Sequence, residues 1–371
     1  MFVYEEQNWP KFRWDAACLQ ASLAQVSLHE GLLLGRLQDI GFETRRLASC
    51  AIATREIVSS HAIEGERLDA ESVRSSVARH LDGAVGSADS SDHRSDALVE
   101  MTLDATQKAS EPLTLKRLCA WHRCLFPTGY SGMTKIAVGR LRNDADGPML
   151  VVSRGKPTPR VHFRAPDAAR LPQEMKRFLA WFNKDDAATP LFVRAGLAHL
   201  WFLTLHPFDD GNGRLARALT DSLIARGEKM PFRFYSVSDE ICRQKNEYYL
   251  RLERAQRSGL DVTPWLAWFL QVVDRSIRAS DETLKRMLEK AIFWRRHGQD
   301  GMNERQTELV NLLWDGFDGN MTSSKWAKIG KCSQDTAIRE LSGLVACGAL
   351  EKVGQGRTTH YVLPKEKQEN A

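Results

Sequence analysis

The sequence predicts a mainly helical protein with one β-hairpin and a small C-terminal winged helix-turn-helix domain. Three observations support this prediction. Apolar residues recur at helical spacing through most of the 371 residues. Two short β-branched runs flank a Gly/Pro turn within residues 149–163, the clearest strand signal before residue 300. After Asn303, three short helical segments precede two strand-like runs at 350–353 and 359–362, the element order of a winged helix.

The composition is that of an ordinary water-soluble chain. Charged residues make up 27% and hydrophobic residues 43%, and no apolar run approaches the length of a membrane span. The N-terminus lacks the pattern of a secretory signal, and the seven cysteines show neither a disulfide framework nor zinc-site spacing. We therefore expect reduced cysteines and a cytoplasmic protein. The net charge of +5 permits contact with nucleic acid but does not indicate it.

Shifts in pattern divide the chain into four regions. We expect a helical N-terminal module at 1–96, a helical core at 97–275, a helical connector at 276–302 and the winged domain at 303–371. Residues 82–96 are rich in Gly, Ala, Ser and Asp without an apolar period, which predicts a flexible linker within the first region.

One loop, residues 206–217, carries most of the chemistry of the chain. A helical pattern over 191–205 precedes it, and Thr189 is the expected N-cap, with proline at the first helical position. A second helical pattern over 215–225 follows and is expected to end at Gly227. The Gly-Asn-Gly-Arg end of the loop should therefore lie at a helix N-terminus, where free N–H groups and the helix dipole favour an anion.

The polar residues of this loop are those that nucleotidyl transfer requires. His206 has a side chain suited to taking a proton from a hydroxyl group. Asp209 and Asp210 are candidate Mg²⁺ ligands, because this hard cation prefers carboxylate and phosphate oxygens. Arg214 and Arg217 lie about one helical turn apart and could direct two planar forks at a polyphosphate. The chain has no Walker A pattern, and an ordinary Gly-rich connection would not explain all these residue types together.

The loop resembles the Fic family signature, His-x-Phe-x-Asp/Glu-Gly-Asn-Gly-Arg-x-x-Arg, at all eight defined positions. Upstream, Ser60-x-x-x-Glu64-Gly65 is similar to the inhibitory motif of this family. On its own, a glutamate at a helix end followed by glycine is an ordinary surface residue. The helical N-terminal module and the C-terminal winged domain are also found in bacterial Fic proteins, so the resemblance covers nearly the whole chain.

This resemblance implies a protein adenylyltransferase with a Fic-type helical core. Such an enzyme transfers AMP from ATP to the hydroxyl group of a Ser, Thr or Tyr side chain of a target protein and releases pyrophosphate. His206 would deprotonate the hydroxyl group, and Asp210 would hold Mg²⁺ against the phosphates. The residues implied in binding ATP phosphates are Gly211, Asn212, Gly213, Arg214, Leu215, Ala216 and Arg217.

Two further regions would contact the substrates if the resemblance holds. The predicted hairpin would act as a flap that pairs with the target segment, through Val151, Val152, Ser153, Val161 and His162. The adenine pocket would be lined by Tyr248, Tyr249 and Gln256. Considered alone, an aromatic pair on a helix is more often part of the core.

The resemblance also implies autoinhibition. A helix at about 55–66 would place Glu64 against Arg217 and so prevent productive placement of the γ-phosphate. We expect Glu64→Gly to raise self-modification strongly and His206→Ala to abolish it. An exposed ion pair would have little effect, so the pair must be at least partly buried.

Partners and alternative functions follow from the same features. We expect protein targets and self-association, whereas DNA binding is less favoured because residues 303–371 contain nine Lys/Arg and nine Asp/Glu. Four basic residues could still form a local basic face, namely Lys325, Lys328, Lys331 and Arg339. The alternatives are a Fic-fold enzyme that uses another nucleotide donor or removes AMP, and a nucleotide-sensing transcription regulator.

Overall fold

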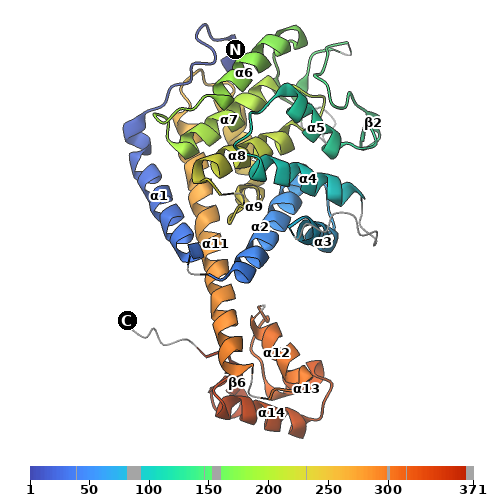
Figure 1. Cartoon of the computed structure of the whole chain (residues 1–371), viewed down its shortest axis with the longest axis vertical. Helices are drawn as coiled ribbons and strands as arrows, with labels where there is room; N and C mark the ends of the chain where they lie inside the picture. The colour runs from blue at the N-terminus through green and yellow to red at the C-terminus, as the bar shows by residue number, and fades with distance from the viewer. Residues whose placement is uncertain are drawn as a thin grey trace. The chain divides into compact units, whose positions relative to one another are not determined.

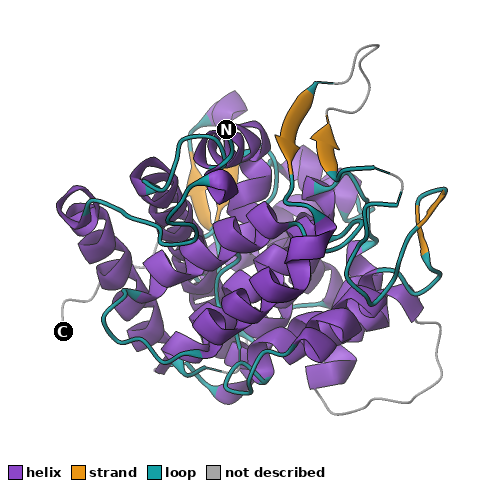
Figure 2. Cartoon of the chain, turned by 90° about the horizontal axis from the view of Figure 1, so that it is seen from above, coloured by secondary structure: helices purple, strands orange, loops and turns teal. Residues whose placement is uncertain are grey.

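The structure is a computed structural model of the chain, shown in Figure 1. The residues it describes are 1–38, 40–81, 93–145, 147–152, 160–230, 232–298, 301–314 and 316–364. It consists of two compact units, Met1–Asp281 and Glu282–Ala371. Helices dominate and the strands are short (Figure 2), as the sequence predicted. Among the described helices, none combines the length and apolar character needed to cross a membrane.

The first unit begins with a short 3₁₀ helix and five α-helices. Their bounds are η1 Val3–Glu5, α1 Ala16–Gln38, α2 Phe42–Ile63, α3 Ala70–Leu81, α4 His93–Gln107 and α5 Leu115–Leu125. The predicted linker 82–96 is wrong at its end, because 93–96 form the first turn of α4; residues 82–92 lie outside the described residues. Helix α1 is fixed to a later helix by a hydrogen bond between His29 Nδ1 and Asp274 Oδ1 at 2.6 Å and by the ion pair Arg36–Asp281 at 2.5 Å.

Helix α7 (Leu191–Leu205) forms the centre of the first unit, and almost every side chain from Phe192 onward is buried. The predicted cap is wrong. Pro190 is the N-cap rather than the first helical residue, and the Thr189 hydroxyl group donates to Asp186 Oδ2 at 2.8 Å. Because the proline side chain has no oxygen to accept a hydrogen bond, the helix starts without a side-chain cap.

Helix α8 (Asn212–Glu228) packs against α7 and is longer than predicted. Gly227 lies inside the helix, and the left-handed cap is Lys229 with φ 54°. A Cβ at Gly227 would collide with the side chain of Leu191. This glycine therefore serves the packing of α7 on α8 rather than the end of the helix.

The unit is completed by η2 Ala168–Arg170, α6 Leu171–Asn183, α9 Val237–Arg243, α10 Lys245–Ala255 and α11 Thr263–His297. Gln244 separates α9 from α10. Helix α11 is one continuous 35-residue helix that crosses the predicted boundary between the core and the connector at 275/276. The division between the two units falls within α11, after Asp281, so the region 276–302 is not a separate connector helix.

Two antiparallel strand pairs lie in the first unit. The predicted hairpin pairs β3 Leu150–Val152 with β4 Val161–Arg164, and its turn lies outside the described residues. Phe163 is buried and makes edge-to-face contact with Phe2 at 5.2 Å, so the pair lies over the N-terminal segment. A second pair, β1 Tyr130–Ser131 with β2 Thr134–Lys135, was not predicted, because two-residue strands give no alternation to detect.

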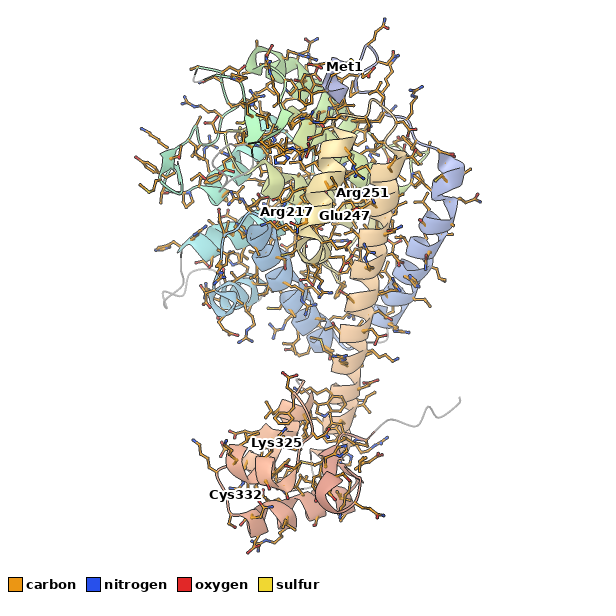
Figure 3. All side chains as sticks on the ribbon, turned by 180° about the vertical axis from the view of Figure 1, so that it is seen from behind. Met1, Arg217, Glu247, Arg251, Lys325 and Cys332 are labelled. Atoms are coloured by element: carbon orange, nitrogen blue, oxygen red, sulfur yellow. The ribbon has the colours of Figure 1, made fainter. Side chains whose placement is uncertain are left out.

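The second unit has three helices followed by an antiparallel pair, the order that the sequence predicted. The bounds are α12 Glu304–Trp314, α13 Ser323–Ile329, α14 Gln334–Ala346, β5 Glu351–Val353, η3 Gly356–Thr358 and β6 His360–Val362. Its core centres on Trp326, whose indole N–H donates to the buried carboxylate of Glu340 at 2.9 Å. In this unit, Figure 3 labels Lys325 on α13 and Cys332 between α13 and α14.

Candidate active site

The histidine end of the 206–217 loop is held in an unusual backbone conformation. His206 follows α7 with φ 48° and ψ 57°, the left-handed region, which costs a residue with a Cβ about 1–2 kcal/mol. Its N–H donates to Phe202 O at 3.0 Å, and its carbonyl accepts from Arg142 Nε at 2.7 Å. This conformation turns the chain sharply out of α7 and into the loop.

The protonation of His206 can be read from its contacts. Nδ1 lies 3.3 Å from the carbonyl oxygen of Leu203, which can only accept, so Nδ1 carries the proton. Burial, together with the nearby Arg142 charge, lowers the pKa of His206 to about 4. At neutral pH the ring is therefore neutral, and the lone pair on Nε2 can accept a proton.

The middle of the loop closes on itself. The Asn212 side-chain amide donates to Phe208 O at 2.8 Å, while its oxygen accepts from Phe208 N at 3.0 Å. Gly211 has φ 79°, and a Cβ there would lie 2.8 Å from the Phe126 ring, so glycine is required on both counts. Because the Asn212 side chain is used in this closure, only the backbone N–H of Asn212, the first residue of α8, remains for an anion.

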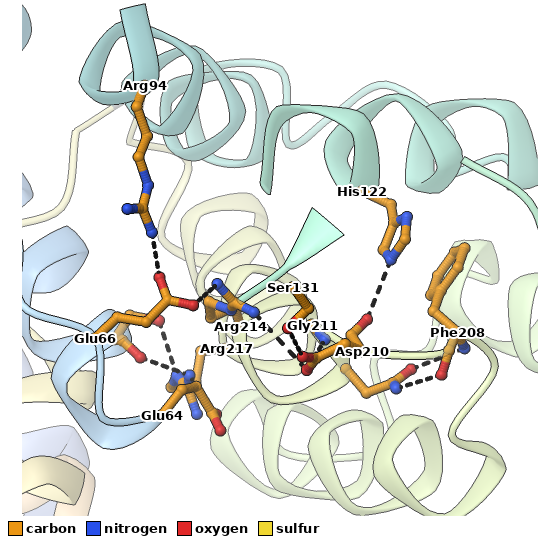
Figure 4. A network of polar contacts seen from close by, with 12 residues as sticks. Glu64, Glu66, Arg94, His122, Ser131, Phe208, Asp210, Gly211, Arg214 and Arg217 are labelled. Carbon is orange, nitrogen blue, oxygen red and sulfur yellow. Dashed lines mark hydrogen bonds and ion pairs between the residues drawn. The ribbon is translucent and has the colours of Figure 1, made fainter. Parts of the chain in front are cut away.

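A buried histidine outside the motif holds the acidic part of the loop. Gly139 N donates to His122 Nδ1 at 2.9 Å, so Nε2 carries the proton and donates to Asp210 O at 3.1 Å. The His122 ring stacks on Phe208 with centroids 4.4 Å apart. Burial lowers the pKa of His122, which keeps it neutral and suited to these two contacts. Figure 4 shows His122 above the Asp210 backbone.

The two acidic residues of the loop differ in their contacts. Asp209 accepts from Ala137 N at 2.7 Å, which anchors the loop to the chain after β2. The Asp210 carboxylate accepts from Ser131 Oγ at 2.5 Å and from Gly211 N at 2.6 Å, and it lies 3.8 Å from Arg214. Among the described residues, no group of three or more His, Cys, Asp or Glu side chains is arranged to hold a metal ion. Any Mg²⁺ at Asp210 would therefore need oxygen ligands from a phosphate, as Mg²⁺ sites commonly have.

At the arginine end, Arg217 is bound to the end of α2. Its Nε donates to Ser60 Oγ at 2.8 Å, and Nη2 donates to Ser60 O at 2.7 Å and Glu64 Oε1 at 2.9 Å. The side chain of Arg217 is 2% exposed and that of Glu64 is 30% exposed. The structure thus brings together the residues that the sequence singled out, in a pair that is mostly removed from water.

A tight turn after α2 sets the direction of Glu64. Gly65 has φ 84°, Gly65 N donates to Ala62 O, and Glu66 N donates to His61 O, which together form a Schellman motif. Gly65 is therefore the C′ residue that the sequence predicted. The turn directs Glu64 and Glu66, on either side of the glycine, toward the arginines of α8 (Figure 4).

Glu66 holds the other arginine of the motif and was not singled out from the sequence. Its Oε1 accepts from Arg214 Nη1 at 2.8 Å, and Oε2 accepts from Arg94 Nη2 at 2.5 Å. The Arg214 guanidinium also lies over the Phe126 ring, 4.8 Å from its centroid. Each arginine of the motif thus forms an ion pair with a glutamate that follows α2, Arg217 with Glu64 and Arg214 with Glu66.

The N-terminus of α8 fits an anion. Arg214 Nε and Arg217 Nη1 are buried, and neither has a hydrogen-bond partner within the described part of the chain. A Cβ at Gly213 would overlap with Glu64 Oε1 and lie 3.2 Å from Arg217 Nη1. The Glu64 carboxylate therefore lies directly over the first turn of α8, where free N–H groups favour negative charge.

Two residues of the predicted phosphate-binding set do not face this site. Leu215 and Ala216 are fully buried, and Leu215 N donates to Gly211 O at 3.0 Å as the first backbone bond of α8. Helical geometry turns both side chains into the core. The side chains of Leu215 and Ala216 are thus part of the core, and the N–H of Leu215 is used inside α8.

The predicted adenine pocket is only partly compatible with the structure. Tyr248 is 1% exposed, and its hydroxyl group lies 3.0 Å from His199 Nε2 in an aromatic cluster with Trp265. Gln256 is also buried, and its Nε2 donates to Leu203 O at 3.3 Å. Tyr249 is 39% exposed, and its hydroxyl group donates to Ile63 O at 3.2 Å. Of the three residues, only Tyr249 presents a ring surface to solvent beside the end of α2.

The predicted flap residues lie on the β3–β4 pair. Val151 pairs with Phe163, Val152 pairs with Val161, and a β-bulge lies between the two pairs. His162 Nδ1 lies 2.8 Å from Glu253, which fixes the pair to α10. Ser153 lies outside the described residues.

Comparison with known proteins identifies two matching families. Residues 112–224 match the Fic/DOC family, and residues 2–82 match a domain of unknown function, DUF4172. The first match runs from just before α5 into α8 and includes the whole 206–217 loop. The chain therefore contains a Fic/DOC family domain.

Similar proteins carry the same family name. The protein adenylyltransferase Fic of Drosophila yakuba is 31% identical over 104 residues, which cover 28% of this chain and 19% of that protein. A protein of the same description from Culex quinquefasciatus is 29% identical over 104 residues. The chain thus spans about a fifth of the length of these curated relatives.

Two solved structures share the fold. A Fic family protein from Desulfovibrio desulfuricans G20 matches with a TM-score of 0.51 and 21% identity, over 94% of this chain and 97% of that one. A Fic domain containing signaling protein from Bacteroides thetaiotaomicron VPI-5482 matches with a TM-score of 0.52 and 20% identity, over 71% of this chain and 97% of that one. At these identities the likeness concerns the fold alone.

Proposed function

We propose that this chain is a protein adenylyltransferase that moves AMP from ATP to hydroxyl side chains of target proteins and of itself. The observation that carries this proposal is the arrangement around the first turn of α8. A neutral histidine lies at one end of the loop, and at the other lie two buried arginines, each with a nitrogen that has no hydrogen-bond partner among the described residues. The partial similarity to protein adenylyltransferases supports the choice of nucleotide and reaction.

The reaction would use these residues directly. The hydroxyl oxygen of the target attacks the α-phosphorus of ATP, its proton passes to His206 Nε2, and the bond between the α-phosphorus and the bridging oxygen breaks. AMP is then attached through a phosphodiester bond, and pyrophosphate leaves. Arg214 and Arg217, with the N–H groups of Asn212 and Gly213, would stabilise the charge on the phosphates.

Asp210 is the residue that would hold Mg²⁺ together with the phosphates, and the cation would neutralise charge on the leaving pyrophosphate. Its carboxylate already meets Ser131 Oγ and the N–H of Gly211, so its direction is fixed. The ring of Tyr249 would support the adenine, whereas Tyr248 and Gln256 would act only as buried support.

Autoinhibition is part of the proposal. The Glu64 carboxylate lies over Gly213 and pairs with the buried Arg217, so it competes with a phosphate group for the same positive charge. Glu66 engages Arg214 in the same way. Arginine would have to exchange a carboxylate for a phosphate before ATP could bind productively, which keeps the basal activity low.

The outer parts of the chain would serve regulation and targeting. The β3–β4 pair would hold the target segment through its exposed edge, because Leu150 and Val152 are each 40% exposed. We assign 1–96 to the inhibitory module, 97–275 to the catalytic core and 303–371 to a winged helix. For the regions outside the catalytic core, we favour protein recruitment and self-association over DNA binding, because residues 303–371 have no surplus of positive charge.

Mass spectrometry of the Glu64→Gly protein after incubation with ATP and Mg²⁺ tests this function. The expected product is the intact chain plus one or more AMP groups on Ser, Thr or Tyr, and the Glu64→Gly/His206→Ala double variant should carry none. Parallel incubations with GTP, CTP and UTP would reveal another donor by a different mass increase. Absence of any nucleotide-derived adduct on the chain and on lysate proteins would overturn the proposal.

A further inference from the structure

Arg142 joins two parts of the site that are far apart in sequence. Its Nε donates to His206 O at 2.7 Å and its backbone N–H donates to Pro207 O at 3.0 Å, so it holds the base end of the loop. Its Nη2 donates to Pro166 O at 2.5 Å, just after β4. The side chain is buried, with the residue only 3% exposed.

The contact with Pro166 reaches the foot of the β3–β4 pair. Ala165 N donates to Met149 O at 3.0 Å, which closes the pair at its base. Asp144 accepts from Arg142 Nη1 at 2.8 Å and from Ala168 N at 2.5 Å, so it fixes the guanidinium and the chain after β4 together. The hairpin foot and His206 are therefore held by one planar group.

Arg142 differs from the arginines of the motif in its hydrogen bonding. Each of its three guanidinium nitrogens donates to an acceptor, namely His206 O, Asp144 Oδ1 or Pro166 O. Arg214 and Arg217 each retain a buried nitrogen that has no partner among the described residues. Three of the five N–H groups of Arg142, one on each nitrogen, are thus bound inside the protein, which fixes the plane of the guanidinium group.

We propose that Arg142 is a positioning residue that sets the distance between His206 and the hairpin that holds the target. This inference rests on the proposed function, in which His206 accepts a proton from a hydroxyl group held by that hairpin. The left-handed backbone of His206 is disfavoured for a residue with a Cβ, so it needs an external contact to persist. Lysine cannot replace the planar fork, because one ammonium group cannot serve three acceptors in this arrangement.

The first test compares Arg142→Lys with Arg140→Lys in the full-length Glu64→Gly protein. Arg140 is exposed and lies two residues away in the same segment, so it is a matched control. We expect Arg142→Lys to lower the rate of self-modification at saturating ATP by about 100-fold, as a small misplacement of a base can do. The ATP concentration for half-maximal rate should stay within about twofold, and Arg140→Lys should match the parent.

A retained rate in Arg142→Lys would overturn the proposal. So would a fall in rate with an equal loss of ATP affinity, because that pattern would indicate a general structural role. Thermal melting and direct ATP binding establish that the variant is folded.

The second test does not depend on AMP transfer. Histidine-ring NMR of the two variants would follow His206, identified among the ten histidines by the loss of its signal in His206→Ala. We expect the His206 signal to shift and broaden in Arg142→Lys and to stay unchanged in Arg140→Lys. If the parent protein transfers no AMP, the proposed function fails, and the His206 signal still decides the role of Arg142. An unchanged His206 signal in Arg142→Lys would contradict the inference.

Discussion

The two ends of the 206–217 loop are stabilised by contacts of different kinds. At the histidine end, the carbonyls of His206 and Pro207 accept from Arg142, whose guanidinium nitrogens are all engaged inside the protein. At the arginine end, Arg214 and Arg217 are engaged by carboxylates, and each keeps a buried nitrogen without a partner in the described structure. The first end is complete as it stands, whereas the second has unused capacity for an anion.

We call the histidine end permanent, because its contacts would stay when a nucleotide binds. We call the arginine end exchangeable, because its glutamate contacts would have to give way to phosphate. The position of the base depends on neutral backbone acceptors, which a nucleotide does not displace. The charge of the arginines is shared with Glu64 and Glu66, both of which carry the same kind of oxygen as a phosphate and are 30% exposed. In the proposed function, the base would stay in position while Glu64 and Glu66 close the phosphate site.

The largest expected effect is at the permanent end. His206→Ala in the Glu64→Gly background should lower AMP transfer by about 10²–10⁴-fold, because it removes the proton acceptor. Labelled ATP and gel autoradiography measure this, and ATP binding should remain. Substantial transfer in the double variant would show that another group, or no group, takes the proton.

A smaller effect is expected at the exchangeable end. Glu66→Gln should raise ATP affinity and self-modification by about two- to fivefold, because it frees Arg214 from an ion pair that is partly open to water. Calorimetric titration with ATP checks the affinity. Glu71→Gln is the matched control, since Glu71 pairs with Arg74 at 2.7 Å on the exposed face of α3. Equal effects of the two substitutions would argue against a specific role for Glu66.

The pH dependence tests the state of the base. The neutral form of His206 is active, and its pKa is about 4, so the ring should stay neutral as the pH falls from 8 to 5.5. Titration of His206 should then change the initial rate of the Glu64→Gly protein by less than about twofold over this range. A histidine with an unperturbed pKa would lower the rate about tenfold. His206 also makes stability depend on pH, because its pKa is about 4 in the folded state and about 6.5 in the unfolded chain, so its contribution to stability is lost as the pH falls from about 6.5 to about 4. Circular dichroism at each pH shows whether the protein is still folded. A loss of activity with a midpoint near pH 6.5 in folded protein would contradict the assignment of His206 as a base with a lowered pKa.

The smallest effect concerns the buried tyrosine. Tyr248→Phe removes the hydroxyl group that meets His199 and should lower the free energy of unfolding by about 1 kcal/mol in urea titrations. ATP affinity should stay within about twofold, because the ring does not reach the surface. A large loss of affinity with unchanged stability would restore Tyr248 to the adenine pocket.

Helical content and the grouping of the polar residues of the loop could be predicted because both depend on residues close together in the sequence. Apolar spacing marked α7, and the signature placed His206, Asp210, Arg214 and Arg217 within one loop and the following helix turn. The Ser60–Glu64 spacing likewise placed both side chains on one helix face, and the structure shows both on Arg217.

The errors arose where distant residues decide the outcome. Tyr248 is buried because His199 and Trp265 pack against it, and no local pattern around it shows this. Arg142 and Glu66 gained their contacts through the fold, since their partners lie 64 and 148 residues away. The continuity of α11 was the exception, because the absence of Gly and Pro from 265 to 297 is a local signal that favours one long helix.

The most direct test of the central claim is the initial rate of self-modification of the wild-type protein against Glu64→Gly, at saturating ATP and Mg²⁺. If the Glu64 carboxylate competes with phosphate for Arg217, the variant should be faster by about 5- to 150-fold, the usual range of such coupling. Equal rates in the two proteins would show that the Glu64–Arg217 pair does not restrain the site.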